Sequence, residues 1–173
     1  MTSLHEPVME LVRASLDADA RRVRVRADSP ICQVVSRAAR ADLKVGGLDH
    51  VTGLAMGASV AAACLTDWLS QERNRDVAGA LEEMQRLKAE AGMPDDPVVR
   101  VLKALLTGAP GMEQVAEVMV TLFHEDEEGF YDFIVNLGDY SAATIDALAA
   151  LGISDREATL EGLEEMLVEF YAS

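Results

Sequence analysis

The chain has 173 residues, half of them hydrophobic, which suits a single domain with a sizeable core. Its formal net charge is −15, from 30 Asp and Glu residues against 15 Lys and Arg residues. A charge of this sign repels nucleic acid phosphates and anionic membrane surfaces, so we expect no nucleic-acid partner and no membrane partner.

The negative charge lies almost entirely in the last seventy residues. Residues 1–103 carry fourteen basic and fifteen acidic residues, a balance of −1. Residues 104–173 carry one basic residue, Arg156, against fifteen acidic ones, a balance of −14. This acidic C-terminal half predicts a protein partner with a basic surface, although acidic helix faces that only keep the protein soluble account for the same excess.

The opening residues and the cysteines indicate a cytoplasmic location. The start MTSLHEPVMEL lacks the basic residues and the apolar run of a signal peptide. Cys32 and Cys64 lie far apart on apolar stretches without metal-ligand spacing, which is typical of core residues in a reducing compartment.

Hydrophobic residues at helical spacing predict two helices in the first 46 residues. Pro7 opens a helix that runs to about Ala20, and a second helix begins with Ser29 as its cap and Pro30 at its first position. Between them, the Arg21–Arg26 cluster suits either a short strand or a helix end. We expect its arginines to pair with the acidic C-terminal helices or to contact a partner.

The stretch Val51–Leu69 is the expected centre of the fold. Its first sixteen residues carry no charge, and Asp49 with Thr52 resembles a capping arrangement at its start. A membrane span is disfavoured, because a span needs about 20 strongly apolar residues and this run is shorter and rich in small residues. We therefore predict a helix that other helices surround.

Small residues mark one face of this central helix. Gly53, Gly57 and Ala61 recur at a spacing of four, so they lie above one another on the helix. This pattern predicts close packing of a neighbouring element. Room for a flat ligand is the alternative interpretation.

Further helical patterns follow, most of them closed by Gly or Pro. They cover residues 75–91, 97–107, 112–124, 141–151 and 154–170. Residues 125–140 are apolar enough for either a short helix or a strand between the turn-prone Gly129 and Gly138. Ser154 with Glu157 has the spacing of a capping box. Eight or nine helices predict an all-α single-domain bundle, or stacked helical hairpins, around a central buried helix at about 49–69.

One polar group has residue types that could hold a metal ion. On a continuous helix His124, Glu128 and Asp132 would line one face and could ligate a divalent cation. A solvated turn accounts for the same residues, since they lie next to Gly129 at a predicted helix end.

Signals for catalysis are sparse. His50 beside Asp49 could form a paired base, yet both positions equally suit the capping of a helix. The chain has no Gly-rich phosphate loop with a Lys, no nucleophile elbow and no zinc-ligand spacing. We therefore expect no catalytic residue and no cofactor.

The segment LGDYSAAT at Leu137–Thr144, with an acidic helix after it, resembles the carrier-serine segment of acyl carrier proteins. The resemblance implies a phosphopantetheine arm on Ser141. It covers fewer than ten residues, and both positions next to the serine, Tyr140 and Ala142, depart from the family's pattern. Ser141 is equally explained as the cap of a helix.

These features predict a non-catalytic interaction module, such as an adaptor, accessory subunit, chaperone or inhibitor, that presents an acidic helical surface to a basic protein. The residues expected to contact that partner are Glu113, Glu117, Glu125, Asp126, Glu127, Glu161, Glu164 and Glu165. One alternative is a helical metal- or cofactor-binding enzyme that uses the His124 group or a pocket beside Gly53. A homo-oligomer is another.

Overall fold

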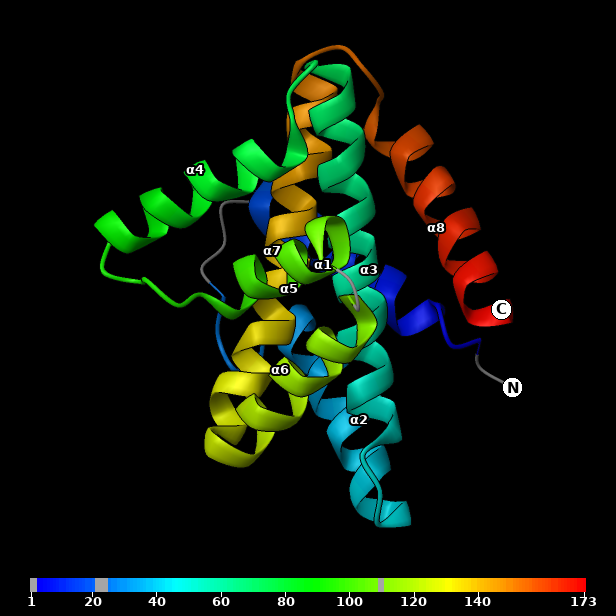
Figure 1. The fold of residues 1–173 in the computed structure, drawn as a ribbon. Helices are drawn as coiled ribbons and strands as arrows, with labels where there is room; N and C mark the ends of the chain where they lie inside the picture. Colours follow the sequence, from blue (N-terminus) through cyan, green and yellow to red (C-terminus); the bar gives the residue numbers. More distant parts are fainter. Residues whose placement is uncertain (1–2, 21–24, 109–110) are drawn as a thin grey trace.

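The computed structural model describes residues 3–20, 25–108 and 111–173, and in this part of the chain every regular element is a helix (Figure 1). The helices are α1 (Glu6–Ala20), α2 (Pro30–Val45), α3 (Asp49–Glu72), α4 (Val77–Glu90), α5 (Pro97–Thr107), α6 (Gly111–Glu125), α7 (Glu127–Ala150) and α8 (Arg156–Ala172). The predicted all-α bundle is therefore confirmed.

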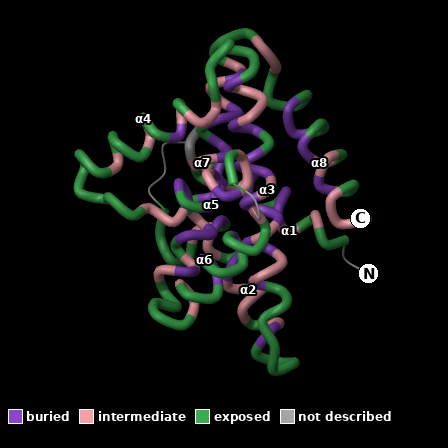
Figure 2. The backbone as a smooth tube through the Cα atoms, in the orientation of Figure 1, coloured by how far each residue is buried: buried purple, intermediate pink, exposed green. Residues whose placement is uncertain are grey.

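Helix α3 is the centre of the bundle, as the uncharged stretch predicts. It contacts each of the other seven helices, and its longest shared interface is with α7. Figure 2 shows buried residues concentrated along α3 and α7, whereas α4 is mostly exposed. By length and composition α3 could cross a membrane, but 61% of its apolar window is buried inside the bundle. That burial is the pattern of a core helix.

Helix α7 corrects the prediction for residues 125–151. The expected turn at Gly138 and the expected helix start at Ser141 are both wrong, because one helix of 24 residues runs through them. Gly138 instead allows α1 to come close: a β-carbon there would lie 2.8 Å from the Ser15 hydroxyl and 3.0 Å from Leu11. The aromatic residues Phe130 and Phe133 are fully buried and help to fill the core.

Two expected helix caps differ in the structure. The Ser29 hydroxyl accepts a hydrogen bond from the Arg26 N–H at 2.7 Å and does not cap α2, although Pro30 does begin that helix. Asp155 caps α8 in place of Ser154, because its Oδ1 accepts from the Ala158 N–H at 2.8 Å. The Arg21–Arg24 part of the arginine cluster lies outside the described residues.

The small-residue face of α3 does allow a close approach, and a side chain from α8 fills it. The Tyr171 hydroxyl donates a hydrogen bond of 2.8 Å to the Gly53 carbonyl and lies against Gly57. Burial raises the pKa of Tyr171 to about 12, so the phenol stays a neutral donor. Gly57 is therefore needed for α8 to reach α3.

We predict that Gly57→Ala destabilises the fold by about 1–3 kcal/mol, because the new β-carbon would overlap the Tyr171 hydroxyl and lie 2.6 Å from Val8. Urea unfolding followed by circular dichroism measures the change. Gly162→Ala in α8 is the matched control, since no atom lies within 4 Å of its β-carbon. It should stabilise by roughly 0.5–1 kcal/mol through helix propensity. Equal stabilisation by both changes would contradict the packing at Gly57.

Candidate functional site: a groove between α1, α2 and α3

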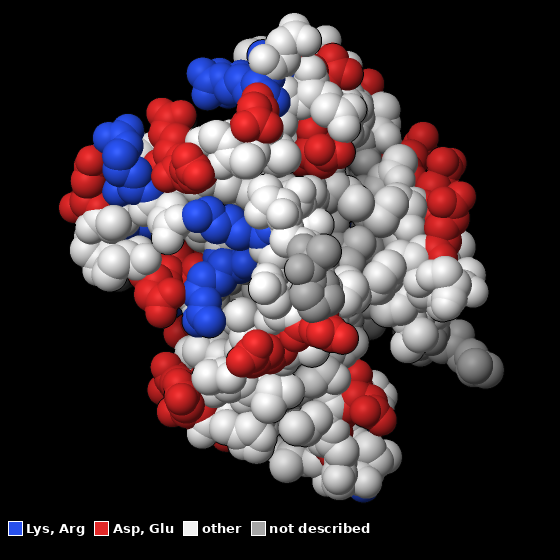
Figure 3. All heavy atoms as spheres, in the orientation of Figure 1, with Lys and Arg blue, Asp and Glu red and all other residues white. Residues whose placement is uncertain are grey.

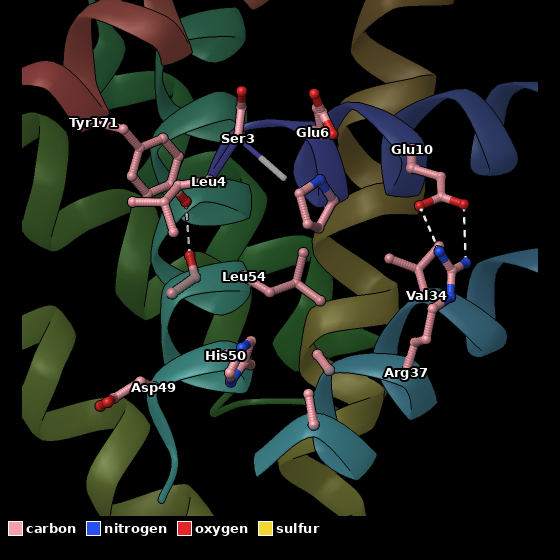
Figure 4. Close-up of a pocket in the computed structure, with 14 residues that line it drawn as sticks. Ser3, Leu4, Glu6, Glu10, Val34, Arg37, Asp49, His50, Leu54 and Tyr171 are labelled. Atoms are coloured by element: carbon pink, nitrogen blue, oxygen red, sulfur yellow. Dashed lines mark hydrogen bonds and ion pairs between the residues drawn. The ribbon is translucent and has the colours of Figure 1, made fainter. Parts of the chain in front are cut away.

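An open groove of about 550 Å³ lies where the N-terminal end of α1 meets α2 and the start of α3 (Figure 4). Tyr171 from the end of α8 closes one side of it. Its apolar lining consists of Leu4, Pro7, Val34, Ala38, Ala41, Gly53 and Leu54. A concave, mainly apolar site with a few polar groups, in the range of roughly 300–1,000 Å³, has the form of a typical binding site.

Helical spacing and small side chains create this space. Val34, Ala38 and Ala41 lie on one face of α2 at spacings of four and three. On α3 the facing position is Gly53, where nothing lies within 4 Å of a β-carbon. The groove is thus open because both walls carry short side chains.

Exposed apolar residues lie at both ends of the groove. Val45 extends the α2 stripe by one more turn and has 70% of its surface exposed, and Leu48 at the start of α3 is 41% exposed. At the α1 end Leu4 is 66% exposed. Exposed apolar residues beside a groove are a common mark of an interaction site.

A buried carboxylate at the groove's lower end holds the start of α3. Asp42 of α2 is 3% exposed, and its oxygens accept from the backbone N–H groups of His50 and Val51, each at 2.9 Å. Asp42 therefore caps α3 from the preceding helix. The expected Asp49–Thr52 cap is wrong, because the Thr52 hydroxyl donates to the Leu48 carbonyl.

Asp42 also orients the His50 side chain. The Nδ1 atom of His50 lies 2.9 Å from Asp42 Oδ1, so the acid paired with this histidine is Asp42, not the adjacent Asp49. Burial raises the pKa of Asp42, but hydrogen bonds from the Val51 and His50 N–H groups and from the imidazole outweigh it and leave that pKa below its ordinary value.

An ionised carboxylate can only accept, so a neutral His50 carries its proton on Nδ1. The Nε2 lone pair is then on the opposite edge of the ring. The His50 side chain is 54% exposed and lies at one end of the groove (Figure 4). This end of the groove therefore offers a hydrogen-bond acceptor.

The other charged groups of the groove are mostly carboxylates. Arg37 makes two hydrogen bonds, of 2.9 and 3.1 Å, to the carboxylate of Glu10. Glu6 and Asp49 are exposed and have no partner among the described residues. With three carboxylates and one guanidinium, the lining has a formal charge of −2.

The described lining of the groove does not bring a nucleophile to His50. A base oriented by a carboxylate needs a nucleophile within hydrogen-bond reach. Figure 4 places Ser3, the one serine of the lining, at the end opposite His50. The arrangement of Asp42 and His50 therefore suits binding better than acyl transfer.

The eight acidic residues predicted to contact a partner fall on two separate surfaces. Five lie on α6 and at the start of α7, and three lie on α8, on the other side of the molecule (Figures 1 and 3). Some already have partners: Asp126 caps α7, Glu127 accepts from the Tyr131 hydroxyl, and Glu164 lies 3.5 Å from Arg13. The sequence therefore identified exposed acids, but they do not form one surface.

The structure does not assemble the metal site considered for His124, Glu128 and Asp132. A break at Asp126 places His124 at the end of α6 and the two acids on α7. Across residues 3–20, 25–108 and 111–173, no group of three or more His, Cys, Asp and Glu side chains has the arrangement of metal ligands.

The carrier interpretation of Ser141 is also unsupported. Ser141 lies in the middle of α7 and is 1% exposed, and its hydroxyl has no hydrogen-bond partner among the described residues. A modifying enzyme could not reach this side chain in the folded bundle.

Comparisons with protein-family models, curated proteins and solved structures gave no match to this chain. The assignment of function therefore rests on the groove itself.

We predict that Asp42→Ala lowers the free energy of unfolding by roughly 2–3 kcal/mol at pH 7, because two backbone N–H groups at the buried start of α3 lose a charged acceptor. The folded-state pKa of Asp42 lies below its ordinary 3.8, so its contribution is complete above that value. It should disappear as the pH falls through the lowered pKa. Urea unfolding of both proteins between pH 3 and 7 measures this.

Asp95→Ala is the control for that experiment. Asp95 is 79% exposed and lies 3.7 Å from Arg100, a surface pair worth at most about 1 kcal/mol. A loss for Asp42→Ala no larger than for this control, or one that is unchanged at pH 3, would contradict the role of the buried carboxylate.

Proposed function

We propose that the protein is a non-catalytic interaction module that binds a segment of a basic partner protein in the groove between α1, α2 and α3. An adaptor, accessory subunit, chaperone or inhibitor would work in this way. The observation that carries the proposal is an open apolar groove whose unpaired charged groups, Glu6 and Asp49, are both carboxylates.

The lining fits an amphipathic helix better than an extended strand. The groove is walled mainly by helices, with Ser3 and Leu4 just before α1, and the described part of the chain has no sheet edge to which a strand could be added. Helix-in-groove recognition uses apolar residues at spacings of three, four and seven. The Val34–Ala38–Ala41 stripe and its extension at Val45 present a matching row of apolar positions.

The charge of the chain would act at longer range. At −15 the molecule attracts cationic partners from any direction, and this raises the rate of encounter more than it slows dissociation. The acids of α6 and α8 would then steer the partner, while the groove would hold it.

A small-molecule ligand is the second candidate, favoured by the groove volume of about 550 Å³ and the oriented His50. It would occupy the same space, so one experiment separates the two. A homo-oligomer would likewise use the exposed apolar residues beside the groove.

The direct test replaces Ala41 with the photo-reactive residue benzoylphenylalanine in the cell of origin. We expect a covalent adduct to a partner protein whose captured segment has Lys or Arg beside helically spaced apolar residues. The matched control is the same replacement at Ala116, which is exposed on α6 and does not line the groove. Equal yields at both positions, adducts only to a second copy, or a small-molecule adduct would each contradict the proposal.

With the captured segment as a synthetic peptide, we predict that Glu6→Gln with Asp49→Asn raises Kd at least about fivefold, chiefly through faster dissociation. Glu113→Gln with Glu117→Gln removes the same charge from α6 and should change Kd less than about twofold. In both proteins the association rate should fall by about tenfold or more between low and high salt. Stopped-flow fluorescence measures these rates, and equal effects of the two pairs would show that the groove carboxylates do not contact the peptide.

A further inference from the structure

We infer that the His50 end of the groove is a subsite for one cation that bears N–H groups, a lysine ammonium or an arginine guanidinium, whose hydrogen bond Nε2 of His50 accepts. This inference rests on the proposed function and names the group by which the bound segment is recognised.

Asp42 fixes the orientation of the His50 imidazole. Asp42 Oδ1 accepts from the His50 backbone N–H and lies 2.9 Å from Nδ1, while Oδ2 accepts from Val51. Rotating the imidazole away would leave a buried carboxylate oxygen with one fewer donor, which is costly in a buried site. The neutral ring therefore keeps Nδ1 toward Asp42 and its Nε2 lone pair free for a ligand.

The polar side chains of the lining differ in whether they already have hydrogen-bond partners. The Tyr171 hydroxyl already donates to the Gly53 carbonyl, and the charge of Arg37 is balanced by the Glu10 carboxylate, to which it donates two of its five N–H groups. The acceptors Glu6, Asp49 and Nε2 of His50 have no partner among the described residues. At the His50 end, a ligand with N–H groups would find the acceptors Nε2 of His50 and the Asp49 carboxylate, whereas a carboxylate or phosphate would meet the negative charge of Asp49.

An apolar floor leads along the groove to His50. Leu54 and Val34 are buried apolar residues of the groove floor, and Figure 4 shows them between the α1 end and His50. An aliphatic stem can pack on such a floor while its charged head reaches a polar end. Asp42 does not bond to the ligand itself, but its negative charge lies directly behind the imidazole.

Three small amphiphiles test the subsite without knowledge of the partner. The probes are n-heptylammonium, heptyltrimethylammonium, which has the same charge but no N–H group, and heptanoate. Each is titrated into the full-length protein at pH 8, with backbone NMR shifts of Gly53 and Leu54 locating the binding. We expect heptylammonium to bind about tenfold more tightly than heptyltrimethylammonium, and heptanoate to bind least.

The substitution His50→Leu removes the acceptor without adding an aromatic face for a quaternary ammonium, and it keeps the backbone N–H that donates to Asp42. In this variant the two cations should bind with equal affinity. His124→Leu on α6 is the matched control, because His124 is exposed and lies outside the groove, and it should keep the tenfold preference.

Equal binding of the two cations to the wild-type groove would overturn the subsite while leaving the groove as a docking site for a basic segment. Tighter binding of heptanoate would overturn both the subsite and the basic character of the partner. If no probe binds in the groove, the subsite is wrong, and cross-linking at position 41 decides the proposed function separately.

Discussion

The buried carboxylate of Asp42 is the interaction on which the groove depends. It comes from the last turns of α2 and satisfies the first backbone N–H groups of α3, so it fixes the corner between two helices that form opposite walls of the groove. The same oxygen that caps α3 also sets which nitrogen of His50 carries the proton. One side chain thus couples the stability of the central helix to the chemistry of the groove's polar end.

Under the proposed function, two scales of electrostatics would act on a partner protein. The overall charge of −15 works over the distance of about one Debye length and cannot distinguish one cation from another. Inside the groove, Arg37 is paired with Glu10 and the Tyr171 hydroxyl donates to the Gly53 carbonyl, whereas Glu6, Asp49 and Nε2 of His50 have no partner among the described residues. Under the proposed function, discrimination between partners would depend on these few short-range groups, while the rate of encounter would depend on the many acids of α6, α7 and α8.

The sequence predicted those features of the fold that depend on the regular spacing of residues along one helix. An uncharged run of sixteen residues was enough to identify α3 as the central helix, and Gly57 was correctly associated with close packing. The interruption expected at Gly138 and Ser141 was wrong, because a glycine that admits a neighbouring helix has the same local pattern as one that ends a helix. The full groove could not be predicted, because its walls come from separate helices and Asp42 resembles any polar residue near a helix end. It had two sequence signals. One was Gly53, beside which a pocket was the alternative interpretation, and the other was His50, which was noted with Asp49 as its partner in place of Asp42.

The protonation state of the His50 ring tests the account most directly. Nitrogen-15 NMR of the imidazole in the free protein at neutral to alkaline pH distinguishes a protonated nitrogen from one with a free lone pair. We expect that Nδ1 carries the proton, held by Asp42, and that Nε2 is unprotonated and open to the groove. A proton on Nε2, or a rapidly averaged mixture of the two forms, would mean that Asp42 does not orient the ring and that the groove has no fixed acceptor.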